Sequence, residues 1–141
     1  MINPKSRRRN EKRLPSMALE PKADLPPLPP PGELTTRTTK TVAWNANPDL
    51  EVYVVDRRTL NSQHRLVDFA VVVQARNGPD EEWREMLKVD TSHRTVHLHR
   101  SGSRDTASVP PDCRTNVDRA HAWAHEYAWN TATTLREVPD G

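Results

Sequence analysis

The chain has 141 residues and a formal net charge of +2; 28% of its residues are charged and 34% are hydrophobic. This length favours a single domain. No apolar run approaches the ~20 residues that a membrane-spanning helix needs, and the basic N-terminus lacks the hydrophobic region of a signal peptide. We therefore expect a soluble, cytoplasmic protein without a membrane partner. The single cysteine, Cys113, excludes an internal disulfide and any zinc site built from several cysteines.

Residues 1–38 are predicted to be a disordered arm that is basic and rich in proline. Residues 1–40 carry nine Lys and Arg against four Asp and Glu, and eight of the thirteen prolines lie within the first 31 residues. Proline fixes φ and removes a backbone donor, so the stretch "LPPLPPPG" (25–32) predicts an extended spacer. The folded domain is then expected over residues 39–138.

The basic side chains of this arm are candidates for binding nucleic acid. Clustered Arg and Lys attract phosphates by displacing counterions, and this attraction does not read the base sequence. The residues concerned are Arg7, Arg8, Arg9, Lys12 and Arg13.

The central part of the chain has the composition of β-strands joined by short turns. The segments rich in β-branched and aromatic residues are 39–46, 50–58, 65–76, 81–90 and 94–100. Asn77-Gly78-Pro79-Asp80 is typical of a hairpin turn, and the short connections favour antiparallel neighbours. The pattern predicts a meander of four to five strands.

One helix is predicted near the C-terminus, starting at Thr115 or Asn116 as N-cap and continuing to about Arg136. Apolar residues recur there at steps of three and four, which gives the helix an apolar stripe. The stripe consists of Ala120, Trp123, Ala124, Tyr127 and Ala128. A sheet and a helix that each have one apolar face bury each other, so we predict an α+β fold: a single small antiparallel sheet covered by one C-terminal helix.

The stretch "VDTSHRTVHLHR" (89–100) holds three of the six histidines. Side chains alternate along a strand, so Val96 and Leu98 are expected to face the core while His97 and His99 stand on the opposite face. Asp90 and His93 lie near the turn that precedes this strand.

Four interpretations of this histidine face remain open. His97 and His99 could be the general base and general acid of RNA cleavage, with Asp90 orienting one ring, because histidine transfers protons near neutral pH. The pair could also ligate a metal, with Asp90 or His93 as third ligand. It could bind a polyanion together with Arg94 and Arg100. The fourth interpretation is a polar strand face in contact with water.

Two further histidines, His121 and His125, are four residues apart on the predicted helix and lie at the edge of its apolar stripe. We expect a solvent-exposed or boundary position for this pair, on the other side of the sheet from His97 and His99, so that the four rings do not form one site. Cys113 precedes the helix and is predicted to be an inert thiol.

The stretch "EEWREMLKVDTSHRTVHLHR" (81–100) resembles a pattern of small uncharacterised prokaryotic domains, among them the TumE-like toxins of toxin–antitoxin pairs. In that pattern a Trp-containing strand ends in Arg-Tyr-Asp, and two clusters of histidines follow. Asp90, His93, His97 and His99 take the matching positions here. The chain departs from the pattern in two places: Lys88-Val89 replaces Arg-Tyr, and there is no Asn-Ala-Pro-His-His run.

The resemblance implies a toxin-like protein that acts on RNA or other nucleic acid, and it adds to the acid–base hypothesis for His97 and His99. The catalytic candidates are therefore His97, His99, Asp90 and His93, with neither cofactor nor metal expected. The partners would be nucleic acid and an antitoxin or adaptor complex. The alternative is a non-enzymatic adaptor that binds nucleic acid through its basic arm and a protein through the proline-rich spacer or a sheet edge.

Overall fold

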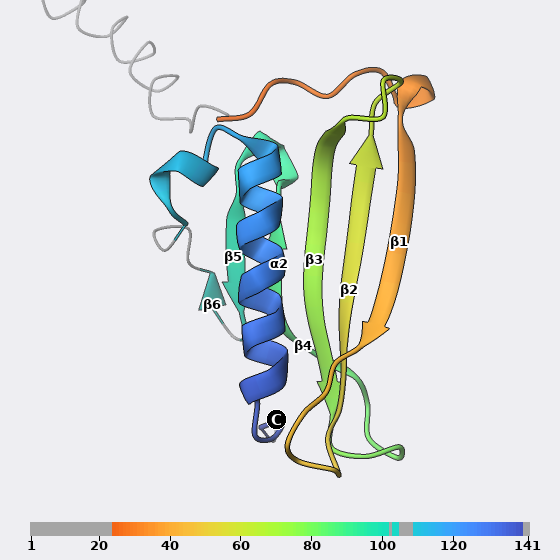
Figure 1. The fold of residues 1–141 in the computed structure, drawn as a ribbon, viewed down its shortest axis with the longest axis vertical. Helices are drawn as coiled ribbons and strands as arrows, with labels where there is room; N and C mark the ends of the chain where they lie inside the picture. The colour runs from red at the N-terminus through yellow and green to blue at the C-terminus, as the bar shows by residue number, and fades with distance from the viewer. Residues whose placement is uncertain (1–23, 102, 105–108, 140–141) are drawn as a thin grey trace, which may run out of the picture.

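The computed structural model describes residues 24–101, 103–104 and 109–139, which form an antiparallel sheet and one long helix (Figure 1). The strands follow one another across the sheet in chain order, which makes it a meander. Their bounds are β1 Thr35–Val42, β2 Glu51–Leu60, β3 Leu66–Arg76, β4 Arg84–Asp90, β5 His97–Arg100 and β6 Ser103–Arg104. The helix α2 spans Val117–Thr134, and the short 3-10 turns are η1 Pro31–Glu33, η2 Ser92–Arg94 and η3 Pro111–Cys113.

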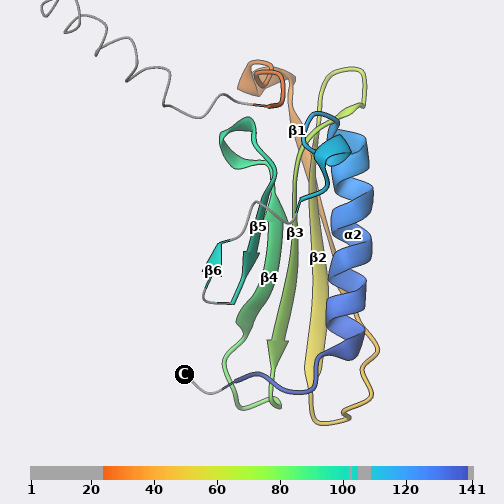
Figure 2. The same ribbon diagram turned by 90° about the vertical axis from the view of Figure 1, so that its left-hand side faces the viewer.

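The predicted α+β fold is confirmed, because α2 packs along one face of the meander (Figure 2). The first five strands correspond to the five predicted segments, and β6 adds two residues to the sheet beside β5. In the described part of the chain, no helix combines the length and the apolar character needed to cross a membrane.

Small side chains bring α2 close to the sheet. The helix packs mostly on β3 and less on β2 and β4. Its innermost residues recur every fourth position and are fully buried; they are Ala120, Ala124, Ala128 and Ala132. The helix begins as predicted, with the Asn116 side chain accepting a hydrogen bond from the Arg119 amide at 3.1 Å. It ends two residues earlier than predicted, because Leu135 takes up an extended conformation.

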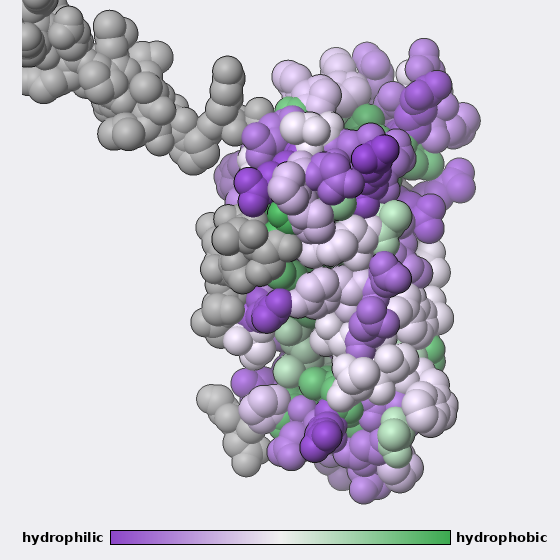
Figure 3. Space-filling model, turned by 60° about the vertical axis from the view of Figure 1, so that its left-hand side comes forward, coloured by the Kyte–Doolittle hydropathy of each residue, from purple (hydrophilic) through white to green (hydrophobic). Residues whose placement is uncertain are grey.

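The sheet has two different faces. Side chains such as Val54, Val73 and Leu98 lie beneath α2 and are buried. Figure 3, turned so that the side of β5 and β6 comes forward, shows apolar residues only as small separate areas among more hydrophilic ones. The opposite face, which we call the uncovered face, carries side chains of the other parity, such as Tyr53 and Lys88, and no described helix packs on it (Figure 2).

The sheet begins earlier in the chain than the sequence pattern indicates. β1 starts at Thr35, so the boundary predicted after residue 38 falls inside a strand that pairs along its whole length with β2. Every residue of β1 is exposed, and the run Thr35–Val42 is mostly threonine with two cations. A strand without buried side chains has no apolar alternation to mark its start, so only the pairing with β2 reveals it.

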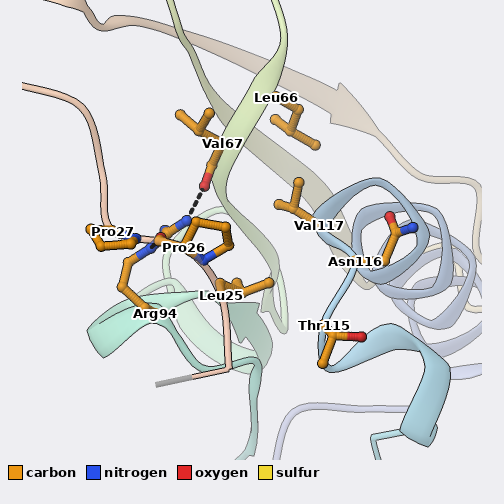
Figure 4. Close-up of a pocket in the computed structure, with 9 residues that line it drawn as sticks. All are labelled: Leu25, Pro26, Pro27, Leu66, Val67, Arg94, Thr115, Asn116 and Val117. Carbon is orange, nitrogen blue, oxygen red and sulfur yellow. Dashed lines mark hydrogen bonds between the residues drawn. The ribbon is translucent and has the colours of Figure 1, made fainter. Parts of the chain in front are cut away.

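Part of the proline-rich segment is also packed against the domain. Leu25 is buried, and the amides of Asp24 and Leu25 donate to the Arg94 carbonyl at 3.1 and 2.9 Å. A pocket of about 270 Å³ separates this segment from β3 and the start of α2, where Val117 lines it (Figure 4). Residues 24–26 of the predicted arm therefore contact the folded unit, and the basic candidates Arg7–Arg9, Lys12 and Arg13 lie outside the described residues.

Candidate functional site

His97 and His99 lie where strand alternation predicts. Their strand neighbours Val96 and Leu98 are buried on the helix side, with 2% and 0% of their surface exposed. The two imidazoles stand on the uncovered face and are partly exposed, and their ring centroids are 5.9 Å apart. This separation lets both rings contact the same small group.

The register of β4 against β5 sets the neighbours of this pair. Asp90 lies directly across from His97, and Lys88 lies directly across from His99. Side chains that face each other in this way are within interaction distance. The Lys88 ammonium is 3.5 Å from the Asp90 carboxylate, so a cation and an anion border the two rings.

Asp90 and His97 meet through the turn at Ser92. One carboxylate oxygen of Asp90 accepts hydrogen bonds from the Ser92 amide at 3.3 Å and the Ser92 hydroxyl at 2.9 Å. His97 Nε2 lies 3.1 Å from the Ser92 carbonyl oxygen. A carbonyl oxygen only accepts, so Nε2 of His97 carries a proton in this arrangement. Asp90 thus positions His97 indirectly, by holding the turn to which the imidazole is bound.

His93 is close in sequence to Asp90 and His97, but its side chain is exposed in the turn η2 and lies off the strand that carries His97. Its backbone has a left-handed φ of 58°. The same turn holds Arg94 at a φ of 59°. Two consecutive left-handed residues reverse the chain between β4 and β5, so this turn breaks the alternation that would otherwise place His93.

Arg94 and Arg100, which were predicted to form a polyanion-binding face with His97 and His99, lie apart from that pair in the structure. Arg94 is bound on three sides, donating to the carbonyls of Pro26 and Val67 at 2.7 Å each and pairing with Asp68 at 3.3 Å. Burial lowers the pKa of its guanidinium, and Asp68 opposes that shift. Arg100 shares the parity of Leu98, and its guanidinium contacts Tyr127 on α2. Neither lies beside His97 and His99 on the uncovered face.

The structure also reveals an acidic residue at the helix–sheet interface that sequence reasoning missed. Asp56 is only 5% exposed, and its oxygens lie 3.0 and 3.1 Å from Nε2 of His121. Arg58 pairs with the same carboxylate at 3.3 Å. The signal was present in β2, because Asp56 has the parity of the buried Val52 and Val54. A carboxylate in an apolar register predicts a buried polar partner.

His125, the second histidine of α2, lies one helical turn after His121 and contacts both His121 and Trp129. The rings of His121 and His125 are 6.0 Å apart, and His125 Nε2 accepts a hydrogen bond from the Trp129 indole at 3.2 Å. The predicted boundary position of both histidines is confirmed, since both are partly buried at the edge of the helix interface. Each pair lies on its own side of the sheet, as expected.

No three His, Cys, Asp or Glu side chains come together as a metal site in the described ranges 24–101, 103–104 and 109–139. Cys113 is buried, and both its burial and the nearby Asp112 raise the pKa of the thiol. A raised pKa keeps the thiol protonated at neutral pH, which favours the inert role predicted for it.

Comparisons of the chain with protein-family models, with curated proteins and with solved structures find no match.

Proposed function

We propose that this protein cleaves RNA by acid–base catalysis at His97 and His99. The observation that carries the proposal is the pair of imidazole rings 5.9 Å apart on the uncovered face, with Lys88 directly across from His99. A phosphate group can bridge the edges of two rings at this separation, with one oxygen within about 2.6–3.2 Å of a nitrogen of each ring.

We assign His97 as the acid because its Nε2 donates to the Ser92 carbonyl, which leaves His99 as the base. His99 acts as the base and takes the proton of a ribose 2′-hydroxyl, whose oxygen then attacks phosphorus. The bond from phosphorus to the 5′-oxygen breaks, and His97, protonated on both ring nitrogens, gives up its hydrogen bond to the Ser92 carbonyl and delivers the Nε2 proton to that leaving oxygen. The products are a 2′,3′-cyclic phosphate and a 5′-hydroxyl end, so atoms and charge balance. The Lys88 cation stabilises the negative charge that builds up on the phosphate oxygens.

The helix pair is a weaker candidate for the same chemistry. Both oxygens of the buried Asp56 carboxylate lie within 3.1 Å of Nε2 of His121, and the His121 side chain is only 14% exposed, so a phosphate has little access to that ring. His97 also has a carboxylate across from it, Asp90, but the sheet pair stands on the uncovered face with Lys88 across from His99. Cleavage of cellular RNA would make the protein toxic to its own cell, and this is the basis for proposing an antitoxin-like protein partner.

The test is incubation of the purified full-length protein with an RNA oligonucleotide and with DNA of the same sequence. We expect cleavage of the RNA only, since DNA lacks the attacking 2′-hydroxyl. His97→Gln and His99→Gln should each lower the rate by about 10²-fold or more. The matched control is His64→Asn, which alters an exposed histidine in the β2–β3 turn at a φ of 62°, a conformation that Asn tolerates.

Two results would contradict the proposal. One is a wild-type protein that leaves RNA intact. The other is cleavage that survives in the His97→Gln/His99→Gln double variant, which would point to a contaminant or to another site. RNA binding without cleavage would favour the non-enzymatic adaptor instead.

A further inference from the structure

An aromatic and basic cluster lies on the uncovered face, away from the histidine pair. Tyr53 of β2 and Trp83, just before β4, have ring centroids 4.9 Å apart. The Lys40 ammonium lies 4.2 Å from the centre of the Tyr53 ring, and the Arg76 guanidinium lies 4.4 Å from that of Trp83. We call these four residues the Tyr53–Trp83 cluster.

An exposed tryptophan extends the cluster toward the sheet edge. Trp44 is 72% exposed, and Val42, across the strands from Tyr53, is 68% exposed. Ala43 is buried and its amide still pairs with the carbonyl of Val52, so alternation continues past the end of β1. Alternation therefore places Trp44 on the side of Val42, the uncovered face. An indole with this exposure has ring surface available for a ligand.

The cluster and the histidine pair share one continuous face. The register places Lys40, Val55, Val72, Lys88 and His99 side by side across five strands. Tyr53 lies two residues along β2 from this row and three strands from His99. At ~3.3 Å per residue and ~4.8 Å per strand, the two sites are about 16 Å apart.

The surface between the two sites carries charges of both signs: Arg76 pairs with Glu51 at 3.0 Å and Lys88 with Asp90 at 3.5 Å, while Lys40 and Arg57 form no ion pair among the described residues. Small aliphatic side chains, Val55, Ala70 and Val72, form its middle. The exposed Arg57 lies in the next row, directly across from Ala70. An exposed indole at one end of the sheet, with Lys40 and Arg57 near it, suits a strand whose bases are unpaired, because bases stack on aromatic rings and phosphates meet the cations.

We infer that the Tyr53–Trp83 cluster and Trp44 bind the unpaired bases of single-stranded RNA and lead that strand to His97 and His99. The inference rests on the proposed function and adds the substrate class: single-stranded rather than duplex RNA, held by stacking at one end of the sheet and cut at the other. Duplex RNA keeps its bases stacked on one another, so the rings cannot reach them.

Binding is measured first, with cleavage removed. In the His97→Gln/His99→Gln background, a labelled single-stranded RNA of about ten nucleotides is titrated and its Kd compared with that of the same sequence as a duplex. Trp44→Ala should raise the single-strand Kd at least fivefold, the lower end of what one lost base stack causes. Lys40→Gln should raise it as well and lower its salt dependence.

The controls alter residues of the same kind elsewhere. Leu28→Ala removes another exposed apolar side chain, and Arg114→Gln removes an exposed cation near α2; both should leave the Kd unchanged. Thermal unfolding checks that each variant is folded, which is expected for Trp44→Ala because the ring is mostly in water.

A cleavage assay distinguishes failure of this inference from failure of the proposed function. In the catalytically intact protein, Trp44→Ala should raise KM for the long RNA without changing kcat, and leave kcat/KM for a dinucleotide unchanged, because a dinucleotide cannot span both sites. A protein that binds single strands through Trp44 yet cleaves nothing would refute the proposed function alone. A Kd that is equal for single-stranded and duplex RNA, or unaffected by Trp44→Ala, would overturn the inference. So would a dimer that Trp44→Ala dissociates.

Discussion

Asp56 and His121 show how a single pair of residues joins α2 to the sheet. Burial by itself raises the pKa of the Asp56 carboxyl, but the hydrogen bond and charge of His121, together with Arg58, outweigh it and leave the pKa below 3.8. The carboxylate is therefore ionised at neutral pH although it is only 5% exposed. The edge of the Phe69 ring lies against His121, with centroids 5.2 Å apart, and completes the contact.

Replacing this carboxylate should destabilise the protein in a pH-dependent way. Asp56→Asn keeps the shape but removes the charge, and should cost about 1.5–3 kcal/mol in the free energy of unfolding at pH 7. The Asp56 carboxyl has a lower pKa in the folded than in the unfolded protein, so its ionised form stabilises the native state above about pH 3.8. This stabilisation is lost as the pH falls through the folded-state pKa of Asp56. Urea unfolding between pH 5 and 3 should thus show a difference between wild type and variant that shrinks in the most acidic samples. A difference that grows on acidification would contradict this account.

At the scale of elements, the four buried alanines of α2 (Ala120, Ala124, Ala128 and Ala132), which form an alanine stripe, explain why the helix lies so near β3. Ala124 and Ala128 are at the centre of the interface and have no exposed surface. Interiors are close-packed, so there is no space there for a longer side chain. The larger residues Trp123 and Tyr127 flank the stripe, with ring centroids 5.5 Å apart, and cover its margin.

Enlarging one alanine of this stripe should separate helix and sheet. Ala124→Leu is expected to lower the free energy of unfolding by about 1–3 kcal/mol, because the added carbons displace β3 or α2. The matched control is Ala122→Leu on the exposed side of the same helix, where the change should stay within about 0.5 kcal/mol. Chemical denaturation of both variants makes the comparison, and equal effects would show that helix propensity rather than packing decides.

The parity of strand residues was the most predictable part of the candidate site. His97 and His99 could be assigned to one face from Val96 and Leu98 alone, since alternation is a property of the strand backbone. The partners across the strands could not be assigned. Lys88 meets His99 only because of the register between β4 and β5, and register depends on the turn at η2, whose left-handed residues the sequence pattern did not indicate.

At the scale of the whole molecule, the segment before β1 is tied to the turn before β5. Arg94 accepts two amide hydrogen bonds on its carbonyl and donates from its side chain to Pro26, so residues far apart in the chain are joined at one end of the sheet. Leu25 contributes its apolar side chain to the same core as α2. The turn that Arg94 belongs to also holds His97, which connects the packing of residues 24–26 to the candidate site.

Removing the Leu25 side chain should test this connection. Leu25→Ala is expected to lower the free energy of unfolding by about 2 kcal/mol or more, because a buried leucine is lost from the core. Leu28→Ala, three residues later and 41% exposed, is the control and should change it by less than about 0.5 kcal/mol. Equal stability of the two variants, measured by urea unfolding, would show that residues 24–26 do not contribute to the folded unit.

The amino-acid sequence by itself determined the features that depend on local periodicity: the antiparallel meander, the helix with its apolar stripe, and the opposite faces of Leu98 and His97. These follow from the rise and twist of each backbone element, which neighbours in the chain set. Only the tertiary structure decided which distant residues meet: Asp56 with His121, Leu25 with the core, Tyr53 with Trp83 and Arg100 with Tyr127. Such contacts depend on strand register and on where the helix packs, and both are properties of the complete fold.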